Sequence, residues 1–184
     1  MKTIVHSAKV FNDGVIEAEV KTKTSLGMGV HVTGLSGTEI INGVRRLILT
    51  LTTLSDITIK PGRQLSVHIV PENLNSSAQF FQLPIALGLM AATHRLRTDE
   101  LDNFLVAGAV DSYGMLHGAF DVRPLVCLAI TNHLKALIVP REARCEPKDA
   151  DPYGKVTVYY ANTLEDARNI LSTPSCREKY LSKN

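Results

Sequence analysis

The sequence predicts an α/β protein, in the broad sense that includes α+β, with one mixed sheet packed against helices. Three observations predict this class. The first third of the 184 residues consists of strand-like segments, the remainder alternates between helical and strand-like segments, and residues 84–92 are apolar or small at nearly every position. A helix that is apolar on all sides is surrounded by protein, so residues 84–92 are expected at the centre of the fold.

The N-terminal residues 3–22 are predicted to form a β-hairpin. Residues 15–22 carry β-branched side chains in partial alternation with polar ones, a pattern typical of a half-buried strand. Asn12-Asp13-Gly14 supplies the turn between the two strands. Two further strands are expected in this region, at residues 27–34 and residues 65–70.

Capping and proline signals predict two helices. Ser36-Gly37-Thr38-Glu39 fits a capping box, in which the serine and glutamate side chains each satisfy an exposed backbone N–H, and it begins an amphipathic helix. Arg45 and Arg46 fall on the solvated side of that helix. The central apolar helix is expected to hold Pro84 in its first turn, because a proline deeper inside a helix costs about 3 kcal/mol.

The C-terminal half of the chain alternates between strands and helices. Residues 104–110 are predicted as a strand that ends in the turn Asp111-Ser112-Tyr113-Gly114, and Thr163 is expected to cap the last helix. We expect a single domain over residues 1–172 and a flexible tail over residues 173–184. The remaining predicted elements are a helix at residues 122–132, strands at residues 136–139 and 156–160, and a helix at residues 163–171.

Composition and charge exclude several classes of protein. The formal net charge is +2 and the charges are mixed along the chain, so charge does not support nucleic-acid binding. Three widely spaced cysteines, an odd number, argue against a disulfide framework and indicate a reducing compartment. The sequence shows no metal-ligand spacing, no signal peptide and no apolar run long enough to cross a membrane. We therefore expect a cytoplasmic protein without metal, cofactor or membrane contact.

Few residues in the sequence indicate catalysis. No phosphate-binding Gly-x-x-x-x-Gly-Lys-Ser/Thr loop occurs, so these residues offer no ATPase machinery. A Ser/His/Asp triad of Ser76, His117 and Asp121 can be written down, but no nucleophile elbow anchors it, and it is disfavoured. Cys127 falls among apolar residues of a predicted helix and is expected to be a core thiol.

Four segments of the chain resemble the magnesium-chelatase-like ComM proteins. In chain order they are Val32-Thr33-Gly34-Leu35-Ser36, Val67-His68-Ile69-Val70-Pro71-Glu72-Asn73-Leu74, Phe81-Gln82-Leu83-Pro84-Ile85-Ala86-Leu87-Gly88 and Gly108-Ala109-Val110-Asp111-Ser112-Tyr113-Gly114-Met115-Leu116. The Leu-Pro-Ile-Ala-Leu-Gly motif in the third is the most specific, and the match runs from about residue 5 to residue 171. The chain is similar to the N-terminal, ChlI-type domain of these proteins. The resemblance implies the ribosomal protein S5 domain 2-like fold, which is shared with the proteolytic domain of Lon-type proteases.

The resemblance also implies what the catalytic positions hold. Lon-type peptidases use a serine–lysine pair, and matching the motifs places Gln82 at the serine position and Arg123 at the lysine position. Gln82 has no nucleophilic oxygen, and Arg123 stays protonated and cannot act as a general base. No catalytic residue is therefore expected at this degenerate pair. Ser76 and Ser77, in the loop before the central helix, are the fallback candidates for a nucleophile.

Three hypotheses for function follow. In ComM-type proteins this domain precedes an AAA+ ATPase module linked to DNA processing, so the favoured function is a non-catalytic accessory domain that binds an AAA+ ATPase, a nucleoprotein complex or a second copy of itself. The alternative is a diverged Lon-like, ATP-dependent serine endopeptidase that uses Ser76 or Ser77 with a lysine such as Lys60 or Lys135. Nucleic-acid binding is the third hypothesis, with these candidate phosphate contacts: Arg45, Arg46, Lys60 and Arg63.

Overall fold

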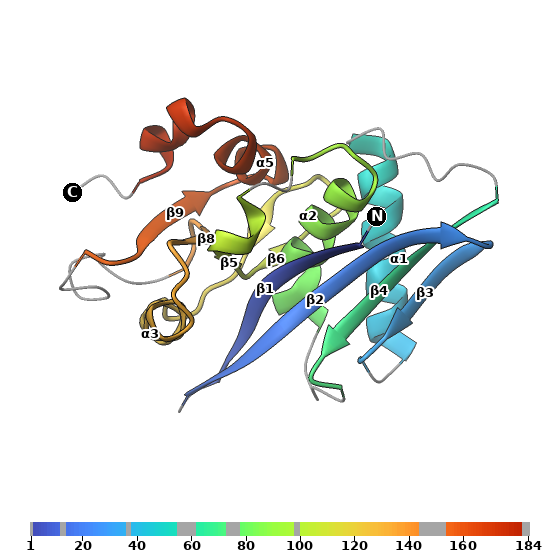
Figure 1. The fold of residues 1–184 in the computed structure, drawn as a ribbon, viewed down its shortest axis with the longest axis horizontal. Helices are drawn as coiled ribbons and strands as arrows, with labels where there is room; N and C mark the ends of the chain where they lie inside the picture. The colour runs from blue at the N-terminus through green and yellow to red at the C-terminus, as the bar shows by residue number, and fades with distance from the viewer. Residues whose placement is uncertain are drawn as a thin grey trace.

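The computed structural model describes residues 2–11, 14–35, 38–54, 62–72, 78–97, 100–143 and 154–181, which form a mixed α/β fold (Figure 1). Seven strands form one sheet in the order β3-β4-β2-β1-β5-β8-β9. Their bounds are β1 (Lys2–Phe11), β2 (Gly14–Leu26), β3 (Gly29–Thr33), β4 (Arg63–Val70), β5 (Phe104–Val106), β8 (Ala136–Pro140) and β9 (Thr157–Ala161). A separate pair joins β6 (Ala109–Val110) to β7 (Leu116–His117). The predicted class, one mixed sheet packed with helices, is confirmed.

Helices cover both faces of the sheet. The described α-helices are α1 (Thr38–Leu54), α2 (Gln82–Ala92), α3 (Arg123–Thr131) and α5 (Leu164–Ser172), and short 3₁₀ helices are η1 (Ala78–Phe81), η2 (Leu101–Asn103) and η3 (Pro174–Tyr180). α1, α2 and α5 share one apolar core, and α3 builds a second core on the opposite face. Thr163 caps α5 in a capping box with Asp166, as predicted. None of the described helices is long and apolar enough to cross a membrane.

β1 and β2 form the predicted hairpin. They pair antiparallel from Lys2 opposite Lys23 to Phe11 opposite Gly14. β2 also pairs antiparallel with β4, and β3 lies parallel to β4 at the edge of the sheet. On the other side of β1, the strands β5, β8 and β9 follow in parallel. The predicted turn at Asn12 and Asp13, and Ser36 and Gly37 of the predicted capping box, lie outside the described residues.

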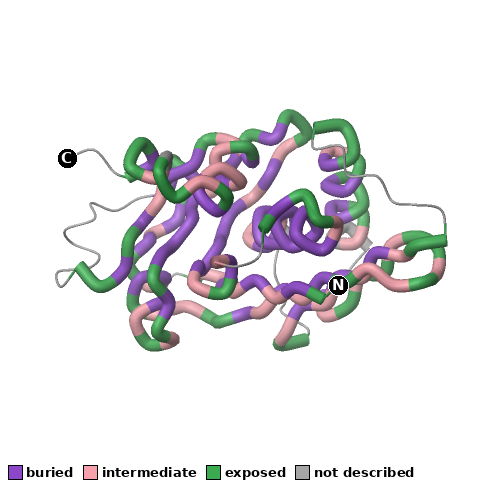
Figure 2. Tube along the Cα trace, turned by 45° about the horizontal axis from the view of Figure 1, so that its top comes forward, coloured by how far each residue is buried: buried purple, intermediate pink, exposed green. Residues whose placement is uncertain are grey.

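α2 is the buried central helix that its apolar sequence predicts. It begins at Gln82, so Pro84 lies in its first turn, and every residue from Leu83 to Ala92 is buried. Figure 2 shows it as an almost entirely buried coil near the centre of the molecule. The helix lies directly against β2, because the Thr22 hydroxyl donates a hydrogen bond of 2.7 Å to the carbonyl oxygen of Gly88.

The predicted strand over residues 104–110 is interrupted in the structure. β5 ends at Val106, and Gly108 has a φ of +145°, a conformation that favours glycine. An added Cβ at Gly108 would lie 2.7 Å from the Cγ of Pro140. The chain therefore leaves the main sheet where it passes closest to Pro140, and β6 pairs with β7 instead.

Cys127 is exposed, so the prediction that it is a core thiol is wrong. The buried side chains of α3 are Leu125, Val126 and Ala129. Successive helical residues are rotated by about 100°, which places Cys127 on the side of the helix away from that cluster. Apolar neighbours in the sequence are not neighbours on the helix surface.

The C-terminal segment contacts the body of the domain through η3. Arg177 forms an ion pair with Glu100, and its Nε donates to the carbonyl oxygen of Ile170 at 2.6 Å. Leu181 forms an antiparallel bridge with Tyr159 of β9. The flexibility of residues 173–184 stays a prediction, but these contacts attach part of that segment to the sheet edge.

Candidate functional site

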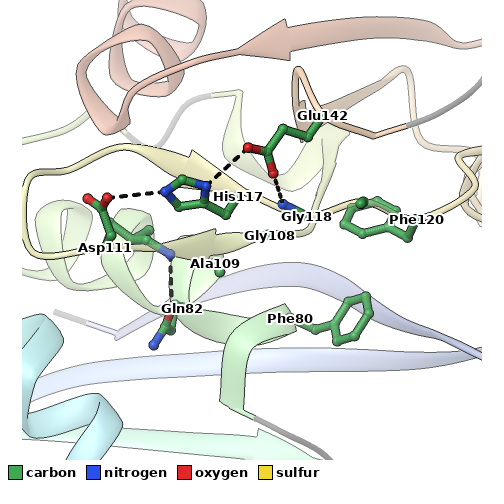
Figure 3. A pocket seen from close by; sticks show the side chains of 11 residues that line it. Phe80, Gln82, Gly108, Ala109, Asp111, His117, Gly118, Phe120 and Glu142 are labelled. Carbon is green, nitrogen blue, oxygen red and sulfur yellow. Dashed lines mark hydrogen bonds and ion pairs between the residues drawn. The ribbon is translucent and has the colours of Figure 1, made fainter.

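A cleft of about 560 Å³ lies where the start of α2 meets the β6–β7 hairpin (Figure 3). Backbone hydrogen bonds bring these parts together. The Gly108 N–H donates to the carbonyl oxygen of Phe80 at 3.2 Å, and the Leu83 N–H donates to the carbonyl oxygen of Gly108 at 3.0 Å. The break in the sheet at Gly108 thus attaches the start of the central helix to the hairpin and forms one wall of the cleft.

Gln82 is the polar side chain of α2 in this cleft. Its Oε1 accepts a hydrogen bond of 2.9 Å from the backbone N–H of Val110. Val110 is the last residue of β6, so the amide holds the helix start and the hairpin in a fixed relation (Figure 3). The side chain at this position therefore acts in the structure as a bridge between two backbone segments.

His117 lies between two carboxylates at the polar end of the cleft. Its Nε2 is 3.1 Å from Asp111 Oδ2, and its Nδ1 is 3.2 Å from Glu142 Oε1 (Figure 3). The hydrogen bond to Asp111, followed by that to Glu142, raises the pKa of His117 above its ordinary value. Both ring nitrogens can donate to carboxylates only when the ring is an imidazolium, so this geometry matches a cationic histidine.

Backbone N–H groups hold both carboxylates in place. Asp111 Oδ1 accepts from the N–H groups of Tyr113 and Met115 at 2.8 and 2.9 Å, the pattern of a side chain that closes its own turn. Partial burial acts to raise the pKa of Asp111, but the hydrogen bonds from His117, Met115 and Tyr113 outweigh it and leave the pKa lowered. The N–H of Gly118, followed by His117, lowers the pKa of Glu142. Each of these interactions favours the charged form of the group concerned.

This arrangement is suited to holding segments together. A histidine that serves as a general base needs a ring nitrogen free to accept a proton, and both nitrogens of His117 are engaged by carboxylates. The side chain joins β7 to the segment after β8 through Glu142. His117 therefore acts as a clamp that fixes the shape of the polar end of the cleft.

The opposite end of the cleft is aromatic. The rings of Phe80 and Phe120 lie 5.5 Å apart at an angle of 39° (Figure 3). The polar end carries two carboxylates and one imidazolium, so its net charge is negative. An apolar end and an acidic end in one cleft favour a ligand with an apolar part and a cationic part.

Comparison with known proteins decides the family. A family model described as subunit ChlI of Mg-chelatase matches residues 16–143. The chain belongs to the ChlI family. The matched residues include every part of the chain that lines the cleft, from η1 to Glu142. The ChlI-type resemblance read from the sequence motifs is confirmed.

A curated relative supports this placement. Competence protein ComM of Haemophilus influenzae is 27% identical to this ChlI-family chain over 112 residues, which cover 61% of the chain and 21% of ComM. The chain thus aligns with about a fifth of the length of this relative.

The predicted site residues of this ChlI-family chain have different partners in the structure. Gln82 bonds to Val110 in the cleft, whereas Arg123 begins α3 and donates through Nε to Asp121 at 2.8 Å. The disfavoured triad of Ser76, His117 and Asp121 requires a contact between His117 and Asp121. The structure contradicts that contact, because His117 bonds to Asp111 and Glu142. The predicted nucleophiles Ser76 and Ser77, and Lys60, lie outside the described residues, and Lys135 lies directly before β8.

The sequence did not identify the two carboxylates as parts of one site. Asp111 was assigned to a turn, and that assignment is correct, since its side chain accepts hydrogen bonds within the turn. Glu142 follows the strand end at Pro140, and no local pattern connects it to His117. The one signal that could have suggested the contact is a charged residue, Glu142, that comes shortly after the end of a strand and near the β6–β7 hairpin.

The stability that the His117 clamp contributes is expected to depend on pH. The pKa of His117 is raised from its ordinary 6.5, so this contribution is complete below pH 6.5 and is lost as the pH rises through the raised value. The pKa values of Asp111 and Glu142 are lowered from 3.8 and 4.5, so their contribution is present above those values and is lost as the pH falls through the lowered ones. The clamp therefore stabilises most between these limits.

The difference in melting temperature between the wild type and His117→Gln measures this dependence. It is expected to be larger near about pH 5.5 than near about pH 9. His31→Gln, at an exposed position of β3, is the matched control and should show a difference that changes little with pH. A difference for His117→Gln that is constant across this range would contradict a cationic clamp.

Proposed function

We propose that this ChlI-family domain is a non-catalytic, cytoplasmic binding domain that works with an AAA+ ATPase in DNA processing. The ATPase is carried either by the same polypeptide or by a separate partner, and self-association is the third form that the binding could take. The family assignment supports this function, because the ChlI-type resemblance implies association with an AAA+ module. We also propose that the domain has the ribosomal protein S5 domain 2-like fold.

One observation carries the non-catalytic part of the proposal. In the described part of the cleft, every polar side chain is bonded to another part of the protein: Gln82 to Val110, and His117 to Asp111 and Glu142. Catalytic acids and bases need a free donor or acceptor directed at the substrate. Groups that are bonded internally define a rigid surface instead, and rigid surfaces favour binding.

The chemistry of the cleft indicates what a partner would present. The rings of Phe80 and Phe120 accept an apolar side chain, and Asp111 and Glu142 favour a neighbouring lysine or arginine. We therefore expect the cleft to bind an extended segment of the AAA+ partner in which an apolar residue lies close to a basic one.

A matched pair of glutamate variants tests this binding. The dissociation constant for the AAA+ ATPase would be measured by calorimetry for the wild type, Glu142→Gln and Glu165→Gln. Glu142 lies at the cleft, whereas Glu165 is a similarly exposed carboxylate on α5 that pairs with Arg168. Glu142→Gln is expected to weaken binding about tenfold and Glu165→Gln to leave it unchanged, since removing one partner of a charged contact costs about 1.4 kcal/mol or more. Equal affinities for all three proteins would contradict the cleft as the binding site.

Peptidase activity is the outcome that would replace the proposal. Purified protein incubated with casein, with and without ATP and the AAA+ ATPase, is expected to produce no fragments. Cleavage that Ser76→Ala or Ser77→Ala abolishes would instead establish a Lon-like serine endopeptidase. Cleavage that survives both substitutions would point to a contaminating protease and leave the binding proposal standing on the calorimetry.

A further inference from the structure

One face of the N-terminal half of the sheet is free of the described helices. α1 and α2 pack on one face of β1, β2, β3 and β4, where Val5, Val20, Leu65 and Val67 belong to the first core. α3 covers the other face at the C-terminal strands and at the turn end of the β1–β2 hairpin, where Asn132 at the end of α3 bonds to Glu17 of β2. In Figure 1 the surface of β2, β4 and β3 that faces the viewer carries no helix, with α1 behind it.

The strand register assembles a polar surface on this face. Two neighbouring rows cross the four strands in the order β3, β4, β2, β1. The first row is His31, Ser66, Lys23 and Lys2, and the second is Thr33, His68, Lys21 and Ile4. We call these residues the open sheet face. Strands are about 4.8 Å apart and alternate residues along a strand about 7 Å apart, so the face is a compact patch.

The charge of the open sheet face is positive. It holds three lysines, and the carboxylate of Glu19 in the adjoining row lies 2.8 Å from Lys21 Nζ. Lys2 and Lys23 are both exposed and occupy directly opposite positions in the register. Like charges directly opposite each other on neighbouring strands destabilise a sheet, and an anion bound between them would remove that repulsion.

The remaining side chains of the face suit a nucleotide. His68 Nδ1 is 2.8 Å from the Thr33 hydroxyl, which fixes the orientation of its ring, and His31 lies exposed on the adjacent edge strand. Ser66 adds a hydroxyl between them and the lysines. Imidazole rings stack on unpaired bases, and lysines contact phosphates as point charges.

We propose that the open sheet face binds single-stranded nucleic acid, with Lys2 and Lys23 contacting phosphates and His31 and His68 stacking against bases. A surface four strands wide does not enter the major groove of a duplex, which admits a helix or a two-stranded ribbon, so the unpaired strand is the form that fits. This surface lies apart from the cleft, and the proposal does not depend on binding of an ATPase there.

The contacts proposed here differ from the arginines that the sequence predicts as phosphate contacts. Arg45 and Arg46 are exposed on α1, which packs against the opposite face of the sheet. Arg63 begins β4 and lies on the same side of that strand as Leu65 and Val67, which point into the core. It is therefore not part of the open sheet face. The two α1 arginines therefore serve as a control of equal charge on the other side of the molecule.

Fluorescence anisotropy of a labelled oligothymidylate of about 20 nucleotides, titrated with the protein at low salt, tests the proposal. Lys2→Gln/Lys23→Gln is expected to weaken binding about tenfold or more, and Arg45→Gln/Arg46→Gln to change it less than about twofold. Loss of two phosphate contacts should reduce the slope of log affinity against log salt by about 1.4. His31→Ala should weaken binding without changing that slope, because stacking releases no counterions.

Three results would overturn the proposal. They are no binding by the wild type at low salt, equal weakening by the lysine and arginine pairs, and tighter binding of a duplex of the same length than of the single strand. The substituted lysines are exposed, and their removal relieves a like-charge contact, so the variants should fold. Unchanged circular dichroism and melting temperature would verify this.

Discussion

Replacing Gly34 with alanine is expected to lower the free energy of unfolding by about 3 kcal/mol. Gly34 has a φ of +86°, and an added Cβ would lie 1.9 Å from the carbonyl oxygen of Ile69. That oxygen belongs to the backbone of β4, where Ile69 lies opposite Val20 of β2. The oxygen cannot move away without disturbing the pairing of β4 with its neighbours in the sheet, so the substitution combines backbone strain with a clash that cannot relax.

Two other glycines separate these causes. Gly62 has a φ of +74° but nothing within 4 Å of an added Cβ, so Gly62→Ala should cost only the backbone strain, about 1 kcal/mol. Gly14 has nothing near an added Cβ and is absent from the positive-φ residues, so Gly14→Ala should stay within about 0.5 kcal/mol of the wild type. Urea denaturation measures all three. Equal losses for Gly34→Ala and Gly62→Ala would show that contact with Ile69 does not contribute.

Gly88→Ala is expected to destabilise the domain by about 2 kcal/mol, although alanine is the better helix former by about 1 kcal/mol. An added Cβ at Gly88 would lie 2.8 Å from Thr22 Cγ2, 3.0 Å from Thr22 Oγ1 and 3.3 Å from Val5 Cγ2. α2 would have to move away from β2 and lose the hydrogen bond that Thr22 donates to the Gly88 carbonyl. In a solvent-exposed helix the same substitution would stabilise.

A double-mutant cycle with Thr22→Ser tests this explanation. Serine keeps the hydroxyl at residue 22 and removes the Cγ2 methyl, the atom closest to the added Cβ. Gly88→Ala should therefore cost at least about 1 kcal/mol less in the Thr22→Ser background, a coupling typical of residues in contact. A cost that is the same in both backgrounds would mean that the destabilisation arises elsewhere.

Local signals predicted most of the fold. The burial of α2 followed from an apolar sequence without a polar side, and its start followed from Pro84. The Thr163 cap followed from a short pattern that needs no distant partner. The need for a glycine at the break could not be predicted, because Pro140, with which a Cβ at Gly108 would clash, comes from another strand. The exposure of Cys127 does not follow from its apolar sequence neighbours, because its phase on α3 decides its burial.

The candidate site was less accessible to prediction. Gln82 was identified through its place in the Leu-Pro-Ile-Ala-Leu-Gly segment, but its bond to Val110 depends on where the β6–β7 hairpin returns. His117 was considered with the wrong aspartate, since Asp121 is nearer in sequence than Glu142 but pairs with Arg123. Side-chain clusters built from distant strand ends carry no periodic signal, so the three-dimensional fold is needed to find them.

The bridge between Leu181 and Tyr159 has a consequence for how molecules of this domain could assemble. A sheet with an unpaired edge strand on each side can add strands from further molecules without limit and form a fibre. Here Leu181 of the C-terminal segment bridges Tyr159 of β9, the edge strand on one side of the sheet, and among the described strands β3 is the edge strand on the other side. Strand addition at β3 alone would stop at a closed pair of molecules related by a twofold axis, so a C-terminal segment that hinders pairing at β9 would disfavour the growth of a fibre.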